Sequence, residues 1–372
     1  MNTNYFICRN EVYIEGESVG EFESFSYTDN SRILGASAEL VLPLYAIGAG
    51  KKGEAGSRMR AIFSNSPIKP CAKVDVYVWY EGYERQLKYS GFIEHIGDGF
   101  PTRLYLNDNS FILRFGQIQK AWDGNATLQQ IAKDCIPIAQ KAFKEERKKQ
   151  GLTMDIPDLT YNVTDTNVQA VTTSLSFRNW GARSPYETVQ KLMQLLCLYG
   201  GVTQDYNLYI GAGVENSTRP IHDLDTRVNV IGRDIVPVDG RFVDYDVKIT
   251  GILANGKKYT ATGGYGTSKS AKSNDGFDKK YGQPFRGYCT LNTPKAIQEF
   301  ADRQLAMLKG FRNKGKLVCL LYPRVELLDQ IQYYDYSFPK LGGQYYVLGY
   351  SFVANEEGYY QTLEVTDQIF LI

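Results

Sequence analysis

Short runs in which apolar and polar residues alternate, separated by turn signals, constrain the fold of this chain more than any other feature. Residues 74–80 alternate in this way, which is the two-residue period of a strand with one buried face. The segment 81–83 then predicts a turn, 87–96 the returning strand and 103–107 a third strand. These patterns predict an antiparallel meander in the amino-terminal part of the chain.

The carboxyl-terminal part returns to the same pattern. Asn255-Gly256 separates residues 247–253 from 258–262, and Asn-Gly is the strongest short hairpin signal because a type I′ turn needs positive φ at both central positions. An additional early pair of strands is expected at 22–27 and 37–44. The strands expected in the tail are 316–321, 330–336, 344–353 and 359–366.

Three helices are expected between these groups of strands. Thr127 and Gln130 fit a capping box, and Pro137 inside the pattern that follows is expected to kink this helix or to start a second one. Residues 184–187 open the clearest helix, with a Ser cap, Pro at the first helical position and Glu three residues after the cap. A further helix is expected at 294–309.

The charge balance removes the simplest argument for a nucleic-acid-binding protein. The chain has 42 Lys and Arg against 41 Asp and Glu, a formal net charge of +1, whereas such proteins normally carry a basic excess that neutralises phosphates. Hydrophobic residues at 43% and charged residues at 22% of 372 are near globular averages. We therefore expect a folded soluble protein of two or three domains, with no signal peptide and no membrane insertion.

The cysteines and histidines offer few candidate metal ligands or acid–base groups. No two of the six cysteines are close enough for a CxxC or zinc knuckle, and they are interpreted as reduced, mostly buried thiols. Of the two histidines, His95 lies in an expected strand and is interpreted as structural. The sequence His222-Asp223-Leu224-Asp225 has the composition of a metal loop, but a solvated turn is favoured because no second ligand group accompanies it. No metal and no cofactor are expected.

A glycine-rich stretch at 263–270 superficially suggests a phosphate-binding loop. It lacks the Gly-Lys-Ser/Thr spacing between a strand and a helix that such a loop requires. The wider segment 263–287 is interpreted as a flexible connection, with a mildly basic contact surface as the alternative. The candidate contact residues in it are Lys269, Lys272, Lys279, Lys280 and Arg286.

The search for catalytic motifs favours a binding or structural role. Neither an HExxH motif nor a dinucleotide-binding fingerprint is present. A carboxylate pair of the glycosidase kind stays open, because separation in space cannot be read from a sequence with 41 acidic residues. We expect a non-enzymatic protein without catalytic residues.

The order of the expected elements carries a family signal in three stretches. The first runs from residue 74 to 111 as strand, turn, Gly-aromatic-Ile, strand and Asp. The second, 184–211, is a helix followed by a short hairpin that ends in Leu-Tyr-Ile-Gly, and the third runs from 317 to 364. In order and texture these stretches resemble the tail hub (baseplate hub) proteins of tailed phages, the family that includes late control protein D and the hub part of type VI secretion spikes. Family members often have Gly-Asp before the penultimate strands, whereas this chain has Leu328-Asp329, which leaves the form of that turn open.

The resemblance implies a specific architecture. It implies an α+β, mainly β fold with two tube-protein-like antiparallel β-barrel domains and smaller mixed α/β insertions. The first barrel is expected in residues 1–120, a mixed helix and hairpin region in 121–240, and the second barrel in 241–372 with the helix 294–309, and the barrels are allowed to be discontinuous in sequence. The family further implies a homotrimer whose six barrels form a ring.

The same resemblance implies a function and its partners. The ring would adapt a six-fold tail tube to a three-fold central spike and serve as an assembly centre, with tape-measure protein and passing DNA in its lumen. The expected location is the tail baseplate of the virion, after synthesis in the bacterial host cytoplasm. Two alternatives stay open, a tail-tip cell-wall or glycan hydrolase and a glycan-binding module.

Many of the 28 tyrosines fall in expected strands. Aromatic side chains supply contact area at modest entropic cost, so tyrosines on strand faces are candidates for subunit contacts. The candidate interface residues are Tyr77, Tyr80, Tyr334, Tyr336, Tyr346, Tyr350 and Tyr360.

Overall fold

Most of the described strands belong to one 13-stranded sheet. Its main path has the order β14-β18-β21-β20-β3-β4-β7-β6-β5-β1-β2, with β19 pairing β20 and β13 pairing β19. The computed structural model describes residues 7–43, 67–98, 101–161, 175–178, 183–196, 198–211, 220–237, 245–253, 255–263, 283–289, 291–309 and 313–367.

The amino-terminal strands form one half of this sheet. They are β1 (Cys8–Ile14), β2 (Glu17–Gly20), β3 (Ser24–Asn30), β4 (Ser37–Leu42), β5 (Lys73–Tyr80), β6 (Gln86–Ile96) and β7 (Thr102–Asp108). In β5 the side chains alternate between fully buried and half-buried, as the valine alternation predicts. The expected meander of β5, β6 and β7 is confirmed, whereas β1 and β2 were not anticipated.

The carboxyl-terminal strands form the other half. They are β13 (Ile221–Asp225), β14 (Val230–Pro237), β18 (Asn313–Leu320), β19 (Gln330–Tyr334), β20 (Gly343–Asn355) and β21 (Gly358–Thr366). β19 ends earlier than expected because the Asp335 carboxylate accepts hydrogen bonds from the backbone N–H groups of Ser337 and Phe338 at 3.0 and 2.8 Å, which forms a turn.

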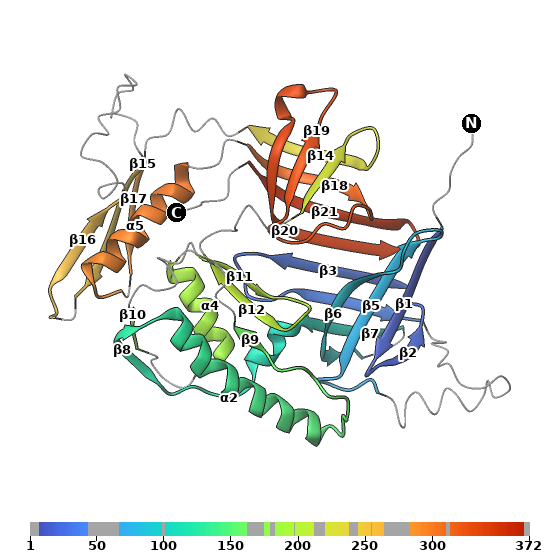
Figure 1. The fold of residues 1–372 in the computed structure, drawn as a ribbon, viewed down its shortest axis with the longest axis horizontal. Helices are drawn as coiled ribbons and strands as arrows, with labels where there is room; N and C mark the ends of the chain where they lie inside the picture. The colour runs from blue at the N-terminus through green and yellow to red at the C-terminus, as the bar shows by residue number, and fades with distance from the viewer. Residues whose placement is uncertain are drawn as a thin grey trace.

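The middle of the chain packs as helices and small sheets beside the large one (Figure 1). After the 3₁₀ turn η1 (Asn109–Arg114) come β8 (Ala121–Ala126), α2 (Leu128–Lys149), β9 (Thr160–Tyr161), β10 (Leu175–Arg178), α4 (Pro185–Leu196), β11 (Tyr199–Val202) and β12 (Asn207–Gly211). A second insertion holds β15 (Tyr245–Ile252), β16 (Lys258–Thr262), β17 (Gln283–Tyr288) and α5 (Pro294–Lys309).

The helix signals of the sequence are confirmed with one refinement. At α4 the Ser184 hydroxyl accepts from the Glu187 N–H and the Glu187 carboxylate accepts from the Ser184 N–H, both at 3.1 Å. Of the two alternatives expected at Pro137, a kink or a second helix, the second helix does not form, because α2 continues through Pro137 to Lys149. The Asn255-Gly256 hairpin is confirmed by the pairing of β15 with β16.

Two five-strand units within the large sheet have the same topology. The first five-strand unit, β3 to β7, has the order β3-β4-β7-β6-β5, and the second, β14 and β18 to β21, has the order β14-β18-β21-β20-β19. All pairings within both units are antiparallel. In chain order, strand for strand, the second unit therefore repeats the first. It begins with β14, inside residues 121–240, and is interrupted by the second insertion.

The repeat extends to the irregular positions. Cys71 and Leu328, with φ of 67° and 68°, stand just before the third strand of their units, and their N–H groups donate to Ile93 and Val347 at 2.7 and 2.8 Å. The following pairing is irregular after Ile93 in β6 and after Val347 in β20. Irregular pairings and left-handed residues are rare enough that their coincidence supports a true structural repeat.

A hydrogen bond at the end of each unit shows the same correspondence. The Asp108 N–H donates to the Ala36 carbonyl at 3.1 Å, and the Asp367 N–H donates to the Asn313 carbonyl at 3.1 Å. Through the Leu328 conformation the turn before β19 takes the left-handed backbone that glycine would favour.

The two units meet where β20 pairs antiparallel with β3 (Figure 1). The pairing aligns Gly349 with Asn30 and Ala354 with Phe25. Rings from both strands, including Phe25 and Phe352 at 6.2 Å between centroids, belong to one buried core shared by both units. The mainly β, α+β fold class is thus confirmed, with both units as parts of one sheet.

Gly315 offers a test of the close contact between β18 and β14. A Cβ at this position would overlap the carbonyl oxygen of Asp234 and lie 2.6 Å from the Cα of Ile235, and neither backbone atom can move alone. We expect Gly315→Ala to lower the free energy of unfolding by about 1–3 kcal/mol in urea denaturation. Gly201→Ala is the control, because nothing lies within 4 Å of its Cβ position. Equal stability of the two variants would contradict the tight contact.

Candidate interaction surface and buried polar cavity

The candidate interface tyrosines are not gathered in one place. Tyr334 and Tyr336 are exposed by 42% and 52% near the end of β19. Tyr77, Tyr346 and Tyr360 are half-buried on β5, β20 and β21. These five side chains do not form a single patch. Tyr77 lies in the first half of the sheet, and in the second half Tyr346 is paired with Gln330 and Thr366 and not with Tyr334 or Tyr360.

Tyr80 and Tyr350 occupy core positions, which corrects the expectation for these two residues. They are 4% and 2% exposed. The Tyr80 hydroxyl donates to the carbonyl of Tyr359 at 2.9 Å, and the Tyr350 hydroxyl donates to the Gln361 side chain at 3.0 Å. A buried tyrosine finds its partner for the hydroxyl inside the fold, so neither ring has a surface to offer a neighbour.

The exposed apolar side chains of the second half lie around β13, β14 and β19. Besides Tyr334 and Tyr336 they include Ile221, Val228, Ile231, Val236 and Phe338, each more than half exposed. Two guanidinium groups cover rings there: Arg227 lies 3.3 Å from the Tyr336 centroid and Arg233 lies 4.4 Å from that of Phe338. Exposed apolar side chains in such number mark a candidate interaction surface.

The basic contact loop lies largely outside the described residues. Lys269, Lys272, Lys279 and Lys280 all fall there, whereas Arg286 lies exposed in β17. The contact role of these five residues stays a prediction.

The two histidines have structural surroundings. His222 was expected in a turn but lies in β13, where its Nε2 is 2.9 Å from an Asp329 carboxylate oxygen. His95 stacks on Tyr105 with 5.9 Å between ring centroids. Within the part of the chain that the structure describes, no three His, Cys, Asp or Glu side chains are placed to hold a metal ion.

One sequence motif needs its structural context. Residues 16–20 read Gly-Glu-Ser-Val-Gly, which has the G-x-S-x-G spacing of a nucleophile elbow. Such an elbow requires a turn from a strand into a helix, but these residues form the turn and second strand of the β1–β2 hairpin. The Ser18 hydroxyl donates to the Glu11 carboxylate at 3.0 Å, so this serine lacks the setting of a catalytic nucleophile.

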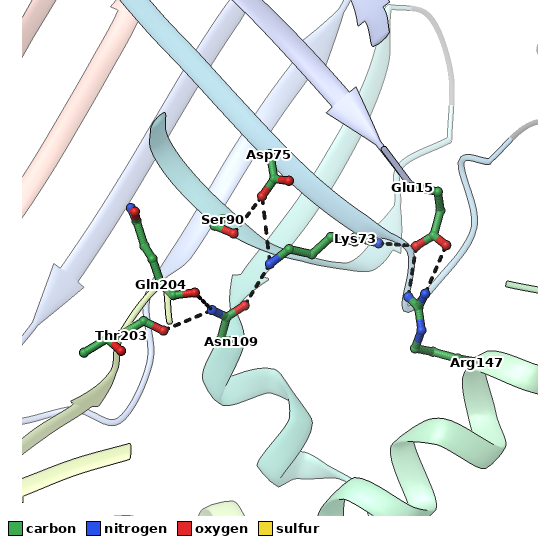
Figure 2. A network of polar contacts seen from close by, with 8 residues as sticks. All are labelled: Glu15, Lys73, Asp75, Ser90, Asn109, Arg147, Thr203 and Gln204. Carbon is green, nitrogen blue, oxygen red and sulfur yellow. Dashed lines mark hydrogen bonds and ion pairs between the residues drawn. The ribbon is translucent and has the colours of Figure 1, made fainter. Parts of the chain in front are cut away.

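A buried polar network fastens the middle region to the first half of the sheet (Figure 2). The Arg147 guanidinium of α2 donates two hydrogen bonds to the Glu15 carboxylate, at 2.9 and 3.0 Å. Both side chains are at most 10% exposed. Arg147 also donates to the Cys71 and Met154 carbonyls at 2.6 and 2.9 Å. The ion pair is therefore fully supplied with partners, as a buried charge pair must be.

Lys73 continues the network toward the β11–β12 hairpin. Its ammonium donates to the Asn109 side chain at 3.0 Å, and Asn109 in turn donates to the carbonyls of Thr203 and Gln204 at 3.0 and 3.3 Å (Figure 2). The rings of Phe92 and Tyr206 lie on either side, each 4.9 Å from the Lys73 nitrogen. Burial lowers the pKa of Lys73 to about 8.

A polar cavity of about 370 Å³ lies next to this network. It is lined by β3, β6, the β7–η1 junction, the β11–β12 hairpin and residues 324–328, so the first unit, the middle region and the second unit all contribute. Burial and the Asp108 carboxylate raise the pKa of Asp29 to about 8. Burial also raises the pKa of Asp108.

Lys88 and Tyr89, which also line this cavity, are 5% and 3% exposed. Burial, helped by the Arg324 charge, lowers the pKa of Lys88 to about 7, and its nitrogen lies 4.7 Å from the Tyr350 ring centroid. The Tyr89 hydroxyl is buried and has no hydrogen-bond partner among the described residues. No sequence signal predicts this cluster, because its members come from strands that are distant along the chain.

In the described helices, no segment is both long and apolar enough to cross a membrane. No protein-family model matches the chain, and no curated protein matches it in sequence.

Solved structures do match along nearly the whole chain. The tail protein from Neisseria meningitidis has a TM-score of 0.60 at 15% identity, covering 98% of both chains. The 43 kDa tail protein of prophage MuSo2 from Shewanella oneidensis has a TM-score of 0.57 at 12% identity, covering 97% of this chain and 98% of the other. The c3393 protein of Escherichia coli, described as a type VI secretion component similar to T4 tail proteins gp27 and gp5, has a TM-score of 0.50 at 11% identity, with coverages of 95% and 76%. The chain therefore has the fold of phage tail proteins, and the resemblance seen in the sequence is confirmed at that level.

Loss of Arg147 should lower the stability of the protein, because the buried Glu15 carboxylate would have no charged partner. We expect Arg147→Met to lower the free energy of unfolding by about 3–5 kcal/mol, since Glu15 would remain buried without its partner. Lys149→Met, which removes an exposed ion pair with Glu146 from the same helix, should leave it nearly unchanged. Chemical denaturation compares the two, and the double variant Glu15→Gln with Arg147→Met should recover part of the loss. Similar losses for Arg147→Met and Lys149→Met would contradict the role of the buried pair.

The buried Lys88 should make the free energy of unfolding rise with pH above neutrality. Its pKa falls from the ordinary 10.5 to about 7 in the folded chain, so between about pH 7 and pH 10 the unfolded state binds one more proton. The free energy of unfolding then rises with pH, by up to about 1.4 kcal/mol per pH unit.

The test is to compare unfolding of Lys88→Met and wild type at pH 7 and pH 9. We expect the variant to lose this rise, so that its stability relative to wild type falls between the two pH values. The exposed Lys141 supplies the control variant Lys141→Met. Parallel pH profiles for wild type and Lys88→Met would refute a neutral buried lysine.

Proposed function

We propose that this protein is the structural hub of a phage tail baseplate, a homotrimeric ring that adapts a six-fold tail tube to a three-fold central spike. The observation that carries the proposal is the repeat of one five-strand topology within the chain, down to the bulge after Ile93 and Val347. Three such chains would supply six similar units, which is what a ring facing a six-fold partner needs while its opposite face keeps three-fold symmetry.

The structural neighbours support the coarser part of this proposal. One is described as a tail protein and one as a prophage tail protein, matched over 98% and 97% of this chain, and a third is described as similar to T4 tail proteins. A tail or baseplate role as a structural protein is the function that these folds share. The hub position, the trimer and the adaptor role are our own extension of it.

The physical character of the chain agrees with a permanent assembly. The formal net charge of +1 gives no general attraction to passing DNA, so a lumen lined by such a chain would not retain it. The exposed Tyr334 and Tyr336, with the half-buried Tyr77, Tyr346 and Tyr360, remain candidate contacts to neighbouring subunits, tube or spike. The loop with Lys269, Lys272, Lys279, Lys280 and Arg286 remains a candidate contact to the same partners or to tape-measure protein.

In this proposal the protein works by binding neighbouring tail proteins and catalyses no reaction. Its location is the virion tail baseplate, it uses no cofactor, and it serves as the centre on which the baseplate assembles. The two units occupy alternate positions of the ring, and the insertions distinguish the alternate positions.

Native mass spectrometry and negative-stain imaging of the purified chain test the proposal. We expect a mass of three times 42.0 kDa and ring-shaped particles with six similar lobes. The same sample should be imaged over a tenfold range of protein concentration, because a ring held by specific interfaces keeps its stoichiometry. A chain that stays monomeric alone and also with its tube and spike proteins would overturn the proposal.

A further inference from the structure

β14 is an edge of the large sheet that has a partner on one side only. It pairs with β18 over Val230–Pro237, and no described strand lies on its other side. Two of its exposed side chains are apolar, Ile231 at 59% and Val236 at 54%, and the third, Asp234, is charged. An open eight-residue edge with exposed apolar side chains is a liability that natural proteins cover or protect with charge and proline.

The repeat identifies what covers the corresponding edge in the first unit. β3 is the counterpart of β14, because each is the first strand of its unit and pairs with the second. β3 has β20 on its other side. The edge that is open in β14 is therefore closed in β3 by the fourth strand of the other unit.

The counterpart of β20 is β6, and its end is available for the same contact. In β20, pairing with β19 stops at Val347 and the pairing with β3 begins at Gly349 on that side. In β6, the pairing with β5 stops at Ile93, and no described strand follows on that side. Glu94, His95 and Asp98 are exposed there.

We propose that β14 of one copy of this chain pairs antiparallel with the carboxyl-terminal end of β6 in the next copy, as β3 pairs with β20 inside the chain. The proposal rests on the proposed function, since it names the strands that join the copies of the ring. The contact is heterologous: each copy gives β14 to one neighbour and β6 to the other. Such a contact excludes a two-fold dimer and gives a ring when its rotation closes, as the proposed three-fold ring requires.

The register follows from the residue correspondence between the units. Val236 is the counterpart of Thr28, because Val236 pairs with Lys314 as Thr28 pairs with Ser37. Gly97 is the counterpart of Ser351, because Gly97 lies opposite Arg103 in β7 as Ser351 lies opposite Thr362 in β21. Since Thr28 pairs with Ser351, Val236 of one copy should pair with Gly97 of the next. Ile235 should then lie opposite Asp98, and Pro237 opposite Ile96.

Pro237 makes the new pairing weaker than its internal counterpart. It stands at the position of Asp29, which in the β3–β20 pair has an N–H to donate, and proline has none. This pair would keep only the bond from the Ile96 N–H to the Pro237 carbonyl. Proline is tolerated in a strand where its missing donor faces away from the strand's own sheet, which agrees with Pro237 lying on an edge strand within each copy.

A disulfide between copies tests the register. Gly97→Cys with Val236→Cys places two thiols on residues that are directly opposite and should give covalent dimers and trimers on mild oxidation, seen by non-reducing gel electrophoresis. Thr28→Cys with Ser351→Cys is the internal reference and should give a link within one chain only. Gly97→Cys with Ile231→Cys, five residues out of register, and wild type with its own cysteines are the negative controls.

A charge at the edge gives a second readout that needs no new cysteine. Val236→Lys should weaken the trimer at least tenfold, because pairing would bury the ammonium against the neighbouring sheet. Val228→Lys, at a 71% exposed position in the preceding turn, should leave it unchanged. A wild-type trimer whose Gly97→Cys, Val236→Cys variant forms no covalent link between copies, and which does not respond to Val236→Lys, would overturn this inference and leave the proposed function standing. A wild-type chain that forms no trimer would instead overturn the proposed function.

Discussion

The antiparallel pairing of β20 with β3 is the contact on which the rest of the architecture depends. β20 has one edge to share: its first residues pair with β19 and its later residues with β3, while β21 occupies the other edge. Without β3 the later half of β20 would be an open edge and the two units would be separate sheets. The shared core, in which Phe25 packs near Phe352, joins the two units into one packed body.

The middle region is held to this body by buried charge and not by apolar packing alone. Arg147 satisfies Glu15 and two carbonyl groups at once, and Lys73 with Asn109 reaches the β11–β12 hairpin. A buried ion pair contributes little net stability compared with apolar packing, but it penalises any arrangement that separates its members. The network therefore fixes where the helices sit on the sheet.

The cavity and the open edge are two consequences of building one chain from two similar units. Where three parts meet, side chains from different origins leave a polar space with Asp29, Asp108 and Lys88 in it. Where the repeat ends, β14 lacks the neighbour that β3 has. An assembly of copies resolves the second problem, because one copy carries both the open strand and the strand that fits it.

The sequence by itself determined the local structure of this protein. Alternation placed β5, β6 and β7, the Ser184 and Glu187 pair placed the start of α4, and Asn255-Gly256 placed a hairpin, since each depends on residues close together in the chain. Element order was enough to indicate the family of folds. The sequence did not reveal β1, β2, β13 or the uninterrupted α2. At these places packing overrides a weak or contrary local signal.

Only the tertiary structure decided the repeat, the cavity and which tyrosines are buried. The counterparts Leu40 and Leu317 are identical, and Ile93 and Val347 are both β-branched, but such residues are common in any β-sheet core. The repeat therefore becomes visible only in the strand order and the hydrogen bonding. Ser31 and Leu348 are joined by hydrogen bonds across 317 positions. Tyr80 and Tyr334 follow the same strand pattern, yet one is 4% exposed and the other 42%. Burial is set by what packs on a strand from far along the chain, and periodicity contains no record of that neighbour.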